Sequence, residues 1–312
     1  MNNKENPKLK RVNMIIDGDC HVWDEESLSG ELHKLLESIA MQYNFEPDLI
    51  LNGTHERLVE KMDEAGIDKT VIVSLDYEYL FRGDVNYKQY NDRIAEMVND
   101  YPDRLIGFGG IDPRRGKAAI KELERCIEEL GFKGLKFWTL TGFYPDDLKF
   151  YPFYKRVEEL GALIFCHTGM GPATTYIKYC RPEYVDTVAV DFPNIKFIMV
   201  HIGDPWTNEA IAVATKNPNV YIDISAWEPT LKMAPFLFYQ TLIQAKLSCG
   251  INKILFGTDW PLFTPILSLK RWVAGIKKMK LPPPLQLMGL PEFSEDEKNK
   301  ILGENAAKLL VL

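Results

Sequence analysis

The sequence has few of the features that would assign it at once to a class of protein. It contains five cysteines and no CxxC pair, so the simplest interpretation is a reduced, cytoplasmic protein without disulfides. No run of about eighteen apolar residues occurs, so no membrane span is expected. The polar segment 1–7 also lacks the apolar stretch of a signal peptide.

Charge and glycine patterns argue against two further classes. The formal net charge is -7, whereas a nucleic-acid-binding domain normally carries a basic patch or stripe. No GxGxxG follows the first apolar run, which weakens a dinucleotide-binding interpretation. With 46% hydrophobic and 26% charged residues, the 312-residue chain has the composition of a globular enzyme. We therefore expect a small-molecule substrate, and neither nucleic acid nor membrane as a partner.

Short apolar runs alternate with amphipathic stretches along the whole chain. Such runs suit parallel strands buried on both faces, and the stretches between them have helical spacing. The runs are 14–16, 70–74, 105–108, 134–137, 162–166, 196–200, 220–224 and 253–256. The clearest helical patterns are 55–65, 90–99, 117–130 and 150–160. Eight such units in a chain of this length predict an α/β fold, a single-domain (β/α)₈ barrel, with an open doubly wound sheet as the alternative.

Two segments fall outside the repeating pattern of the predicted single domain, 1–312. Residues 24–52 form an insertion after the first strand, which would sit over the catalytic face of a barrel and shape a substrate pocket. Near the end of the chain, Ser294 and Glu297 have the spacing of a capping box. They predict a closing helix over residues 294–310.

Histidines and aspartates gather where the apolar runs end. His21, His167 and His201 each follow such a run closely, and Asp259 ends another. Barrel enzymes keep their active sites at this carboxyl-terminal face of the strands. Asp19 and His21 are two residues apart, so both can face the barrel axis and share one cation. For any one histidine the alternative is a hydrogen-bonded core residue. A mixed nitrogen and oxygen ligand set suits Zn²⁺, Mn²⁺ or Fe²⁺.

Lys136 and several tryptophans occupy comparable positions at strand ends. Lys136 is interpreted as a cation that binds the substrate, as a carbamylated bridge between two metals, or as a lysine extending to the barrel mouth. A two-metal site would need more histidines than the sequence offers, which favours one metal. Trp138 and Trp227 are candidates for the substrate pocket, although packing at the barrel mouth explains them equally well.

These motifs together resemble the amidohydrolase-related family of the metallo-dependent hydrolase superfamily. The similarity is to the branch that contains aminocarboxymuconate-semialdehyde decarboxylase and γ-resorcylate decarboxylase. The segments that carry it are 16–21 (IDGDCH), 134–136 (GLK), 166–169 (CHTG), 200–203 (VHIG), 257–261 (GTDWP) and 301–307 (ILGENAA). One departure stands out, because the first motif is Asp19-x-His21, whereas HxH is commonest in the superfamily and ExH occurs in the resorcylate type.

The resemblance implies a ligand set and a reaction. One divalent ion, with Zn²⁺ favoured over Mn²⁺, would be held by Asp19, His21, His167 and Asp259. His201 would be the catalytic acid/base or an additional ligand, and Asp259 would act in catalysis as well. We expect a metal-dependent hydrolase that acts on an ester, lactone or amide of a small organic acid. The alternative is a non-oxidative decarboxylase, a lyase, of a hydroxylated aromatic or unsaturated acid. A homodimer is compatible with the resemblance.

Overall fold

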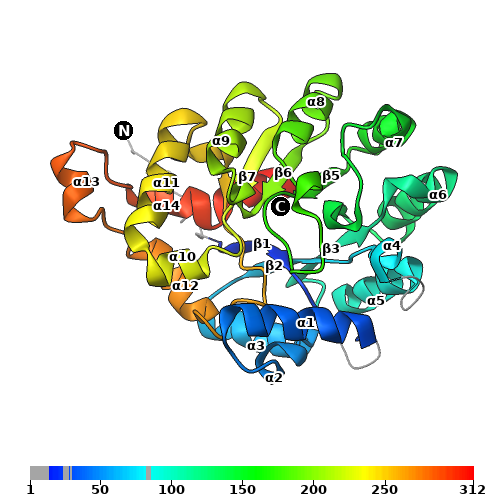
Figure 1. Cartoon of the computed structure of the whole chain (residues 1–312), viewed down its shortest axis with the longest axis horizontal. Coiled ribbons are helices and arrows are strands. Elements are labelled where there is room, and N and C mark those ends of the chain that lie inside the picture. Colours follow the sequence, from blue (N-terminus) through cyan, green and yellow to red (C-terminus); the bar gives the residue numbers. More distant parts are fainter. Residues whose placement is uncertain (1–13, 24–27, 29, 82–85) are drawn as a thin grey trace, which may run out of the picture.

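Eight parallel strands form one sheet in which each strand pairs with the next along the chain (Figure 1). The structure is a computed structural model that describes residues 14–23, 28, 30–81 and 86–312. The strands are β1 Ile16–Cys20, β2 Lys69–Val73, β3 Leu105–Gly110, β4 Gly134–Phe137, β5 Leu163–His167, β6 Phe197–Val200, β7 Val220–Asp223 and β8 Ile254–Leu255. Each predicted apolar run overlaps one strand. The predicted (β/α)₈ barrel is therefore confirmed, and the doubly wound alternative is wrong.

Backbone hydrogen bonds between the two ends of the sheet close the barrel. The amide of Gly18 donates to the carbonyl of Phe256 at 2.9 Å, and the amide of Asp259 donates to the carbonyl of Asp19 at 2.8 Å. Gly18 is needed here, because a Cβ at this position would lie 2.9 Å from the Phe256 oxygen. This closure brings the first and last strands side by side, and with them Asp19 and Asp259.

Helices surround the strands and complete the βα units. They are α1 Gly30–Tyr43, α2 Asp48–Leu51, α3 His55–Ala65, α4 Glu78–Phe81, α5 Tyr87–Asp100, α6 Lys117–Glu124, α7 Tyr151–Leu160, α8 Glu183–Asp191, α9 Thr207–Lys216, α10 Glu228–Met233, α11 Pro235–Ser248, α12 Leu269–Lys277, α13 Pro283–Leu287, α14 Glu295–Asn299 and α15 Asn305–Leu310. All four sequence-predicted helical patterns coincide with helices; the third continues beyond α6 as a π-helical turn, Arg125–Glu129. No helix among the described residues is long and apolar enough to cross a membrane.

The barrel interior is filled by side chains from alternate strand positions, as expected for a closed barrel of eight strands. Val71 and Val73 of β2 pack there against Phe108 of β3 and Phe165 of β5. Helix α15 covers the amino-terminal end of the strands, because its Ala306 and Leu310 belong to the same apolar cluster. Helix α15 therefore packs against that end, and the opposite end is the one at which barrel enzymes carry their active sites.

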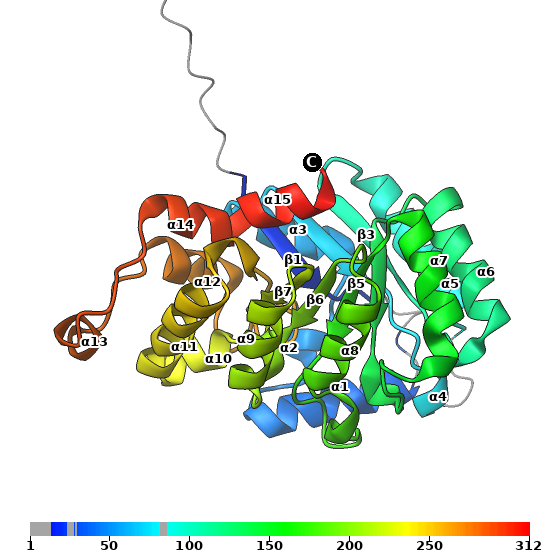
Figure 2. The ribbon, with the colours of Figure 1, turned by 90° about the horizontal axis from the view of Figure 1, so that it is seen from above.

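Helix α1 lies across the opposite end of the barrel from α15 (Figure 2). It belongs to the predicted insertion 24–52, of which residues 24–27 and 29 lie outside the described residues, as does the polar segment 1–7. The rest of the insertion contains α1 and α2. The buried face of α1 carries Leu32, Leu35, Leu36, Ile39 and Ala40. Part of this apolar face is directed at the carboxyl-terminal ends of the strands.

Candidate metal centre and substrate cavity

Backbone strain is concentrated at the carboxyl-terminal rim of the barrel. His201, Ile202, Ala226 and Asp259 all have positive φ angles, of 63°, 46°, 62° and 52°. Residues with side chains rarely adopt this region, and such strain persists only where the surrounding structure imposes it. All four follow strands β6, β7 and β8, and two of them, His201 and Asp259, are predicted site residues. The rim is thus held in a costly conformation at the positions that carry its functional groups.

Asp19, His21 and Asp259 form a cluster whose candidate ligand atoms all lie within 4.8 Å of one another. The His21 Nε2 atom is 2.9 Å from Asp259 Oδ1, and all three residues are buried. Among the described residues, Asp19 Oδ1 and His21 Nδ1 have no hydrogen-bond partner. A buried carboxylate oxygen without a partner is unfavourable unless a cation or a donor satisfies it. The trio therefore fits one divalent cation with nitrogen and oxygen ligands.

His167, the fourth predicted ligand, lies beside this trio rather than within it. It ends β5 with its ring 4.8 Å from that of His201, measured between centroids, and its Nε2 is 3.1 Å from the carbonyl oxygen of Met170. Burial, reinforced by the neighbouring His201 and Lys136, lowers the pKa of His167 well below its usual value. The ring is accordingly neutral, which is the form that binds metals.

Lys136 points at Asp19 and not into the cavity. Its Nζ donates to Asp19 Oδ2 at 2.6 Å, and its side chain is 1% exposed. Strand β4 places it on the barrel axis, where a small Gly134 two residues earlier leaves room for Phe108. The amine thus neutralises one oxygen of Asp19 and leaves the other, Oδ1, free. This contact differs from the predicted contact with substrate.

Three buried carboxyl groups near the cluster differ in protonation. Burial alone would raise the pKa of Asp259, but His201 and the hydrogen bond from His21 lower it below its usual value. Burial raises the pKa of Asp17 and of Asp223 to about 7 in each case. Asp259 is therefore ionised and available as a ligand, while Asp17 and Asp223 hold protons up to near neutral pH.

Asp223 and Ser225 are site residues that sequence reasoning missed. Both contact His201, with Ser225 Oγ 2.9 Å from His201 Nδ1 and Asp223 Oδ1 2.9 Å from the His201 backbone amide. Asp223 is the last residue of β7, and the predicted histidines occupy comparable positions at the ends of their strands. That position was the available signal, since residues two apart at a strand end face the same side.

A cavity of about 910 Å³, counting the part open to solvent, opens above the cluster. His21, His167, His201 and Asp259 line it, so all but one of the predicted metal and acid/base residues face a common space. Its walls are mostly apolar and aromatic, and one of them is α1. The apolar and aromatic lining residues are Trp23, Leu32, Leu35, Leu36, Ile39, Tyr43, Leu75, Trp138, Leu140, Met170, Pro172, Ala226, Trp227, Leu262 and Phe263. Trp138 and Trp227 thus occupy the predicted pocket positions, and Lys136 is absent from the described lining.

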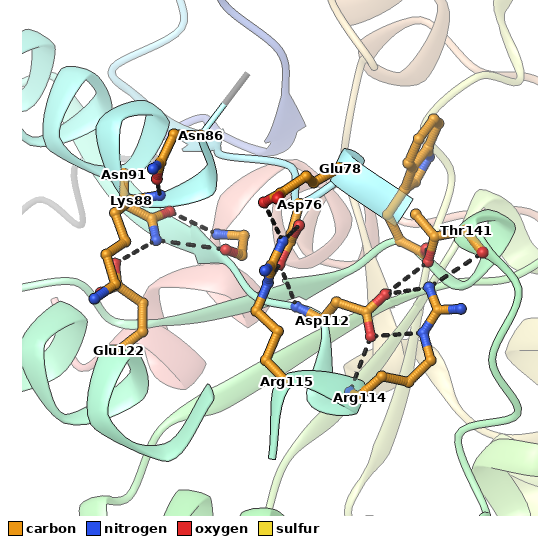
Figure 3. Close-up of polar contacts among 12 residues, drawn as sticks. Asp76, Glu78, Asn86, Lys88, Asn91, Asp112, Arg114, Arg115, Glu122 and Thr141 are labelled. Atoms are coloured by element: carbon orange, nitrogen blue, oxygen red, sulfur yellow. Dashed lines mark hydrogen bonds and ion pairs between the residues drawn. The ribbon is translucent and has the colours of Figure 1, made fainter. Parts of the chain in front are cut away.

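A second group of charged residues, with two buried aspartates, lies at the same rim after β2 and β3 (Figure 3). Arg115 binds Asp76 with two nitrogens at 2.6 and 2.8 Å, and also binds Glu78 at 2.6 Å. Arg114 binds both oxygens of Asp112 at 2.9 and 2.6 Å. The Asp112 amide donates to Asp76 Oδ2, which joins the two ion pairs into one network. Here each buried aspartate has a guanidinium partner.

The fold, the strand-end ligands and the sequence comparison agree on the class of protein. The amidohydrolase family profile matches residues 16–312 of the chain. The chain therefore belongs to the amidohydrolase family, whose related members include metal-dependent enzymes, as the resemblance implied.

Two relatives with named activities are similar to the chain over most of its length. The chain is 28% identical over 251 residues to 2-amino-3-carboxymuconate-6-semialdehyde decarboxylase of Dictyostelium discoideum, covering 71% of this chain and 65% of that protein, which is less than two thirds of its length. It is 27% identical over 253 residues to γ-resorcylate decarboxylase of Polaromonas sp., covering 66% of this chain and 76% of that protein. Both named activities are decarboxylations.

A solved structure shows the same fold. It is a dihydroxybenzoic acid decarboxylase from Polaromonas sp. JS666 with bound manganese and the inhibitor 2-nitroresorcinol, and its TM-score is 0.67 at 22% identity. The match covers 96% of this chain and 97% of the other.

Proposed function

We propose that the protein is a metal-dependent non-oxidative decarboxylase of a hydroxylated aromatic or unsaturated carboxylic acid. The observation that carries the proposal is the Asp19–His21–Asp259 cluster, with its unpartnered oxygen, at the floor of an apolar and aromatic cavity. The named activities of two relatives support decarboxylation. Ester, lactone or amide hydrolysis, the first expectation from sequence, has no comparable support.

The residues that would hold the metal are Asp19, His21 and Asp259, with His167 completing the set. A divalent ion bound there would supply a positive charge that binds the carboxylate of the substrate and an adjacent oxygen. Zn²⁺ and Mn²⁺ use overlapping ligands. Manganese in the dihydroxybenzoic acid decarboxylase structure supports testing it beside Zn²⁺.

The chain's own side chains would bind the substrate body and exchange the proton. Trp138 and Trp227 line the cavity and offer flat apolar surfaces to an aromatic or conjugated acid. In the reaction the bond between the carboxylate and the ring carbon breaks, its electron pair stays on that carbon, and CO₂ leaves. One proton from solvent replaces the carboxylate, and His201 or Asp259 would deliver it, because both face the cavity.

The face of α1 that covers the cavity would exclude water and set the shape of the substrate. Leu36 and Ile39 line the cavity from this helix and are themselves buried. An apolar wall favours the uncharged product and the apolar body of the acid over a second charged group. We therefore expect substrates with one carboxylate and a largely apolar remainder.

The test is to incubate Zn²⁺- and Mn²⁺-loaded protein with hydroxybenzoates and unsaturated hydroxy acids and to measure CO₂ release. In D₂O the product should carry one deuteron at the carbon that lost the carboxylate. Asp259→Asn protein, prepared in parallel, is the control for activity from contaminants. Hydrolysis of a lactone and ester panel without CO₂ release from any acid would contradict the proposal.

A further inference from the structure

A chain of three side chains connects the end of β7 with the ring of His201. Ser225 Oγ lies 2.6 Å from Asp223 Oδ1 and 2.9 Å from His201 Nδ1. Asp223 and Ser225 are completely buried, and His201 is buried where it lines the cavity. The three groups are thus sealed from bulk water on the side away from the cavity, and their hydrogen bonds have to satisfy one another.

The direction of each hydrogen bond follows from the partners of Asp223. Its Oδ1 accepts from the backbone amides of His201 at 2.9 Å and Ser225 at 3.1 Å. That oxygen is therefore an acceptor, and a proton on the carboxyl group would reside on Oδ2, which has no partner among the described residues. The Ser225 hydroxyl, in contact with the same Oδ1, must donate to it.

With its hydrogen committed to Asp223, the Ser225 oxygen can only accept from His201. Its partner Nδ1 must then carry a hydrogen. A second contact agrees, because the same Nδ1 lies 3.4 Å from the carbonyl oxygen of Ser225, and a carbonyl only accepts. In a neutral imidazole with the hydrogen on Nδ1, the lone pair is on Nε2.

We propose that Ser225 is a positioning residue that fixes His201 as the tautomer protonated at Nδ1. The Nε2 lone pair is then presented to the cavity, where it can take up and return a proton. Asp223 orients Ser225 and also holds the strained backbone of His201, whose φ is 63°. The kinetic consequence rests on the proposed function, whereas the tautomer is a property of the folded protein itself.

Nitrogen NMR of the Zn²⁺-loaded protein, labelled with ¹⁵N-histidine, tests the tautomer directly. The chain has only five histidines, and the signals of His201 are those missing from a His201→Gln variant. The expected result is a protonated Nδ1 and an unprotonated Nε2 for His201 at neutral pH. The opposite tautomer, or a mixture of both, in the wild-type protein would overturn the proposal.

The kinetic test compares Ser225→Ala with Ser225→Thr, which keeps the hydroxyl. Ser225→Ala should give mixed His201 tautomers and a kcat lower by about 10²-fold, the usual size of an acid/base contribution, with KM within about twofold. Ser225→Thr should restore the wild-type tautomer and most of kcat. Bound zinc should stay stoichiometric in both.

Ser74→Ala is the matched control. Ser74 is a fully buried serine after β2 whose hydroxyl has no partner among the described residues. Its loss should leave the His201 signals unchanged. If Ser225→Ala keeps both the wild-type tautomer and kcat, Ser225 has no positioning role and the inference fails. If the tautomer changes and kcat does not, the positioning role holds and the proton-transfer role of His201 in the proposed function is contradicted instead.

Discussion

Two groups of buried acids lie on the same rim of the barrel and differ in their partners. After β2 and β3, Asp76 and Asp112 are each bound by an arginine through two nitrogens (Figure 3). Between β1 and β8, Lys136 binds Asp19 and His21 binds Asp259, and Asp19 Oδ1 has no partner among the described residues. In the first group every carboxyl oxygen of the two aspartates has a donor, whereas in the second group Asp19 Oδ1 has none among the described residues.

The difference separates a structural network from a cation site. Planar guanidinium groups match carboxylates atom for atom, so the arginine network can be satisfied by protein alone. It fixes the loops after β2, β3 and β4 near Leu75 and Trp138, which line the cavity. In the second group a compact ammonium covers one oxygen of Asp19 and leaves the other facing His21 and Asp259. A divalent cation would satisfy this arrangement.

The largest expected effect is on the incomplete group. Asp259→Asn should lower kcat/KM by about 10³-fold or more, because in the proposed function Asp259 both binds the metal and faces the substrate. The measurement is decarboxylation of the best acid at saturating metal. Asp76→Asn, in the arginine network, is the comparison variant. Its kcat/KM should fall by less than about tenfold, because Asp76 touches no reacting atom. Equal losses of kcat/KM in the two variants would contradict the distinction between a metal site and a structural network.

The second effect is on stability. Lys136→Met should lower the free energy of unfolding of the metal-free protein by about 3–5 kcal/mol, because it leaves a buried Asp19 carboxylate without its partner. Chemical denaturation with and without saturating Zn²⁺ measures it. Bound metal should reduce the deficit, since the ion replaces the lost positive charge. A deficit that is the same with and without metal would mean that Asp19 is not a ligand.

A third, smaller effect is expected in the arginine network. Arg115→Met should lower the free energy of unfolding by about 2 kcal/mol, because Asp76 keeps one backbone donor but loses its guanidinium. Metal content, measured by mass spectrometry of the purified protein, should stay at the wild-type value. Loss of metal from Arg115→Met would show that the arginine network also supports the metal site, which would contradict the separation of the two groups.

The smallest effect is expected for exposed ion pairs. Lys61→Ala on α3 removes contacts with Glu64 and Glu60 that lie in solvent. It should change the free energy of unfolding by less than about 0.5 kcal/mol, as is usual for screened surface pairs. Denaturation in low and high salt measures it. A loss comparable with that of Arg115→Met would show that pairing matters regardless of burial.

The sequence predicts the barrel well because each strand carries its own local signal. Continuous apolar runs mark strands buried on both faces, and the residues that follow them reach the same rim once the barrel closes. Asp19, His21 and Asp259 could therefore be placed together in advance. The exact spacing of β1 could not, because a register shift between Asp17 and Cys20 depends on its pairing with β2.

What the sequence could not reveal is which polar groups partner one another. Lys136 and Asp19 are 117 residues apart, and only the closed barrel turns the lysine toward Asp19 instead of the cavity. Ser225 carries no motif of its own, and its role comes from lying between Asp223 and His201. The ligand role of His167, the cytoplasmic location and the homodimer stay predictions.

Anomalous X-ray diffraction from crystals of the metal-loaded protein, collected at the absorption edge of the metal, tests the central claim most directly. The account predicts one peak per chain, about 2.0–2.2 Å from a ligand atom of each of Asp19, His21 and Asp259. A peak bound elsewhere in the chain, or no peak in protein that decarboxylates its substrate, would contradict it.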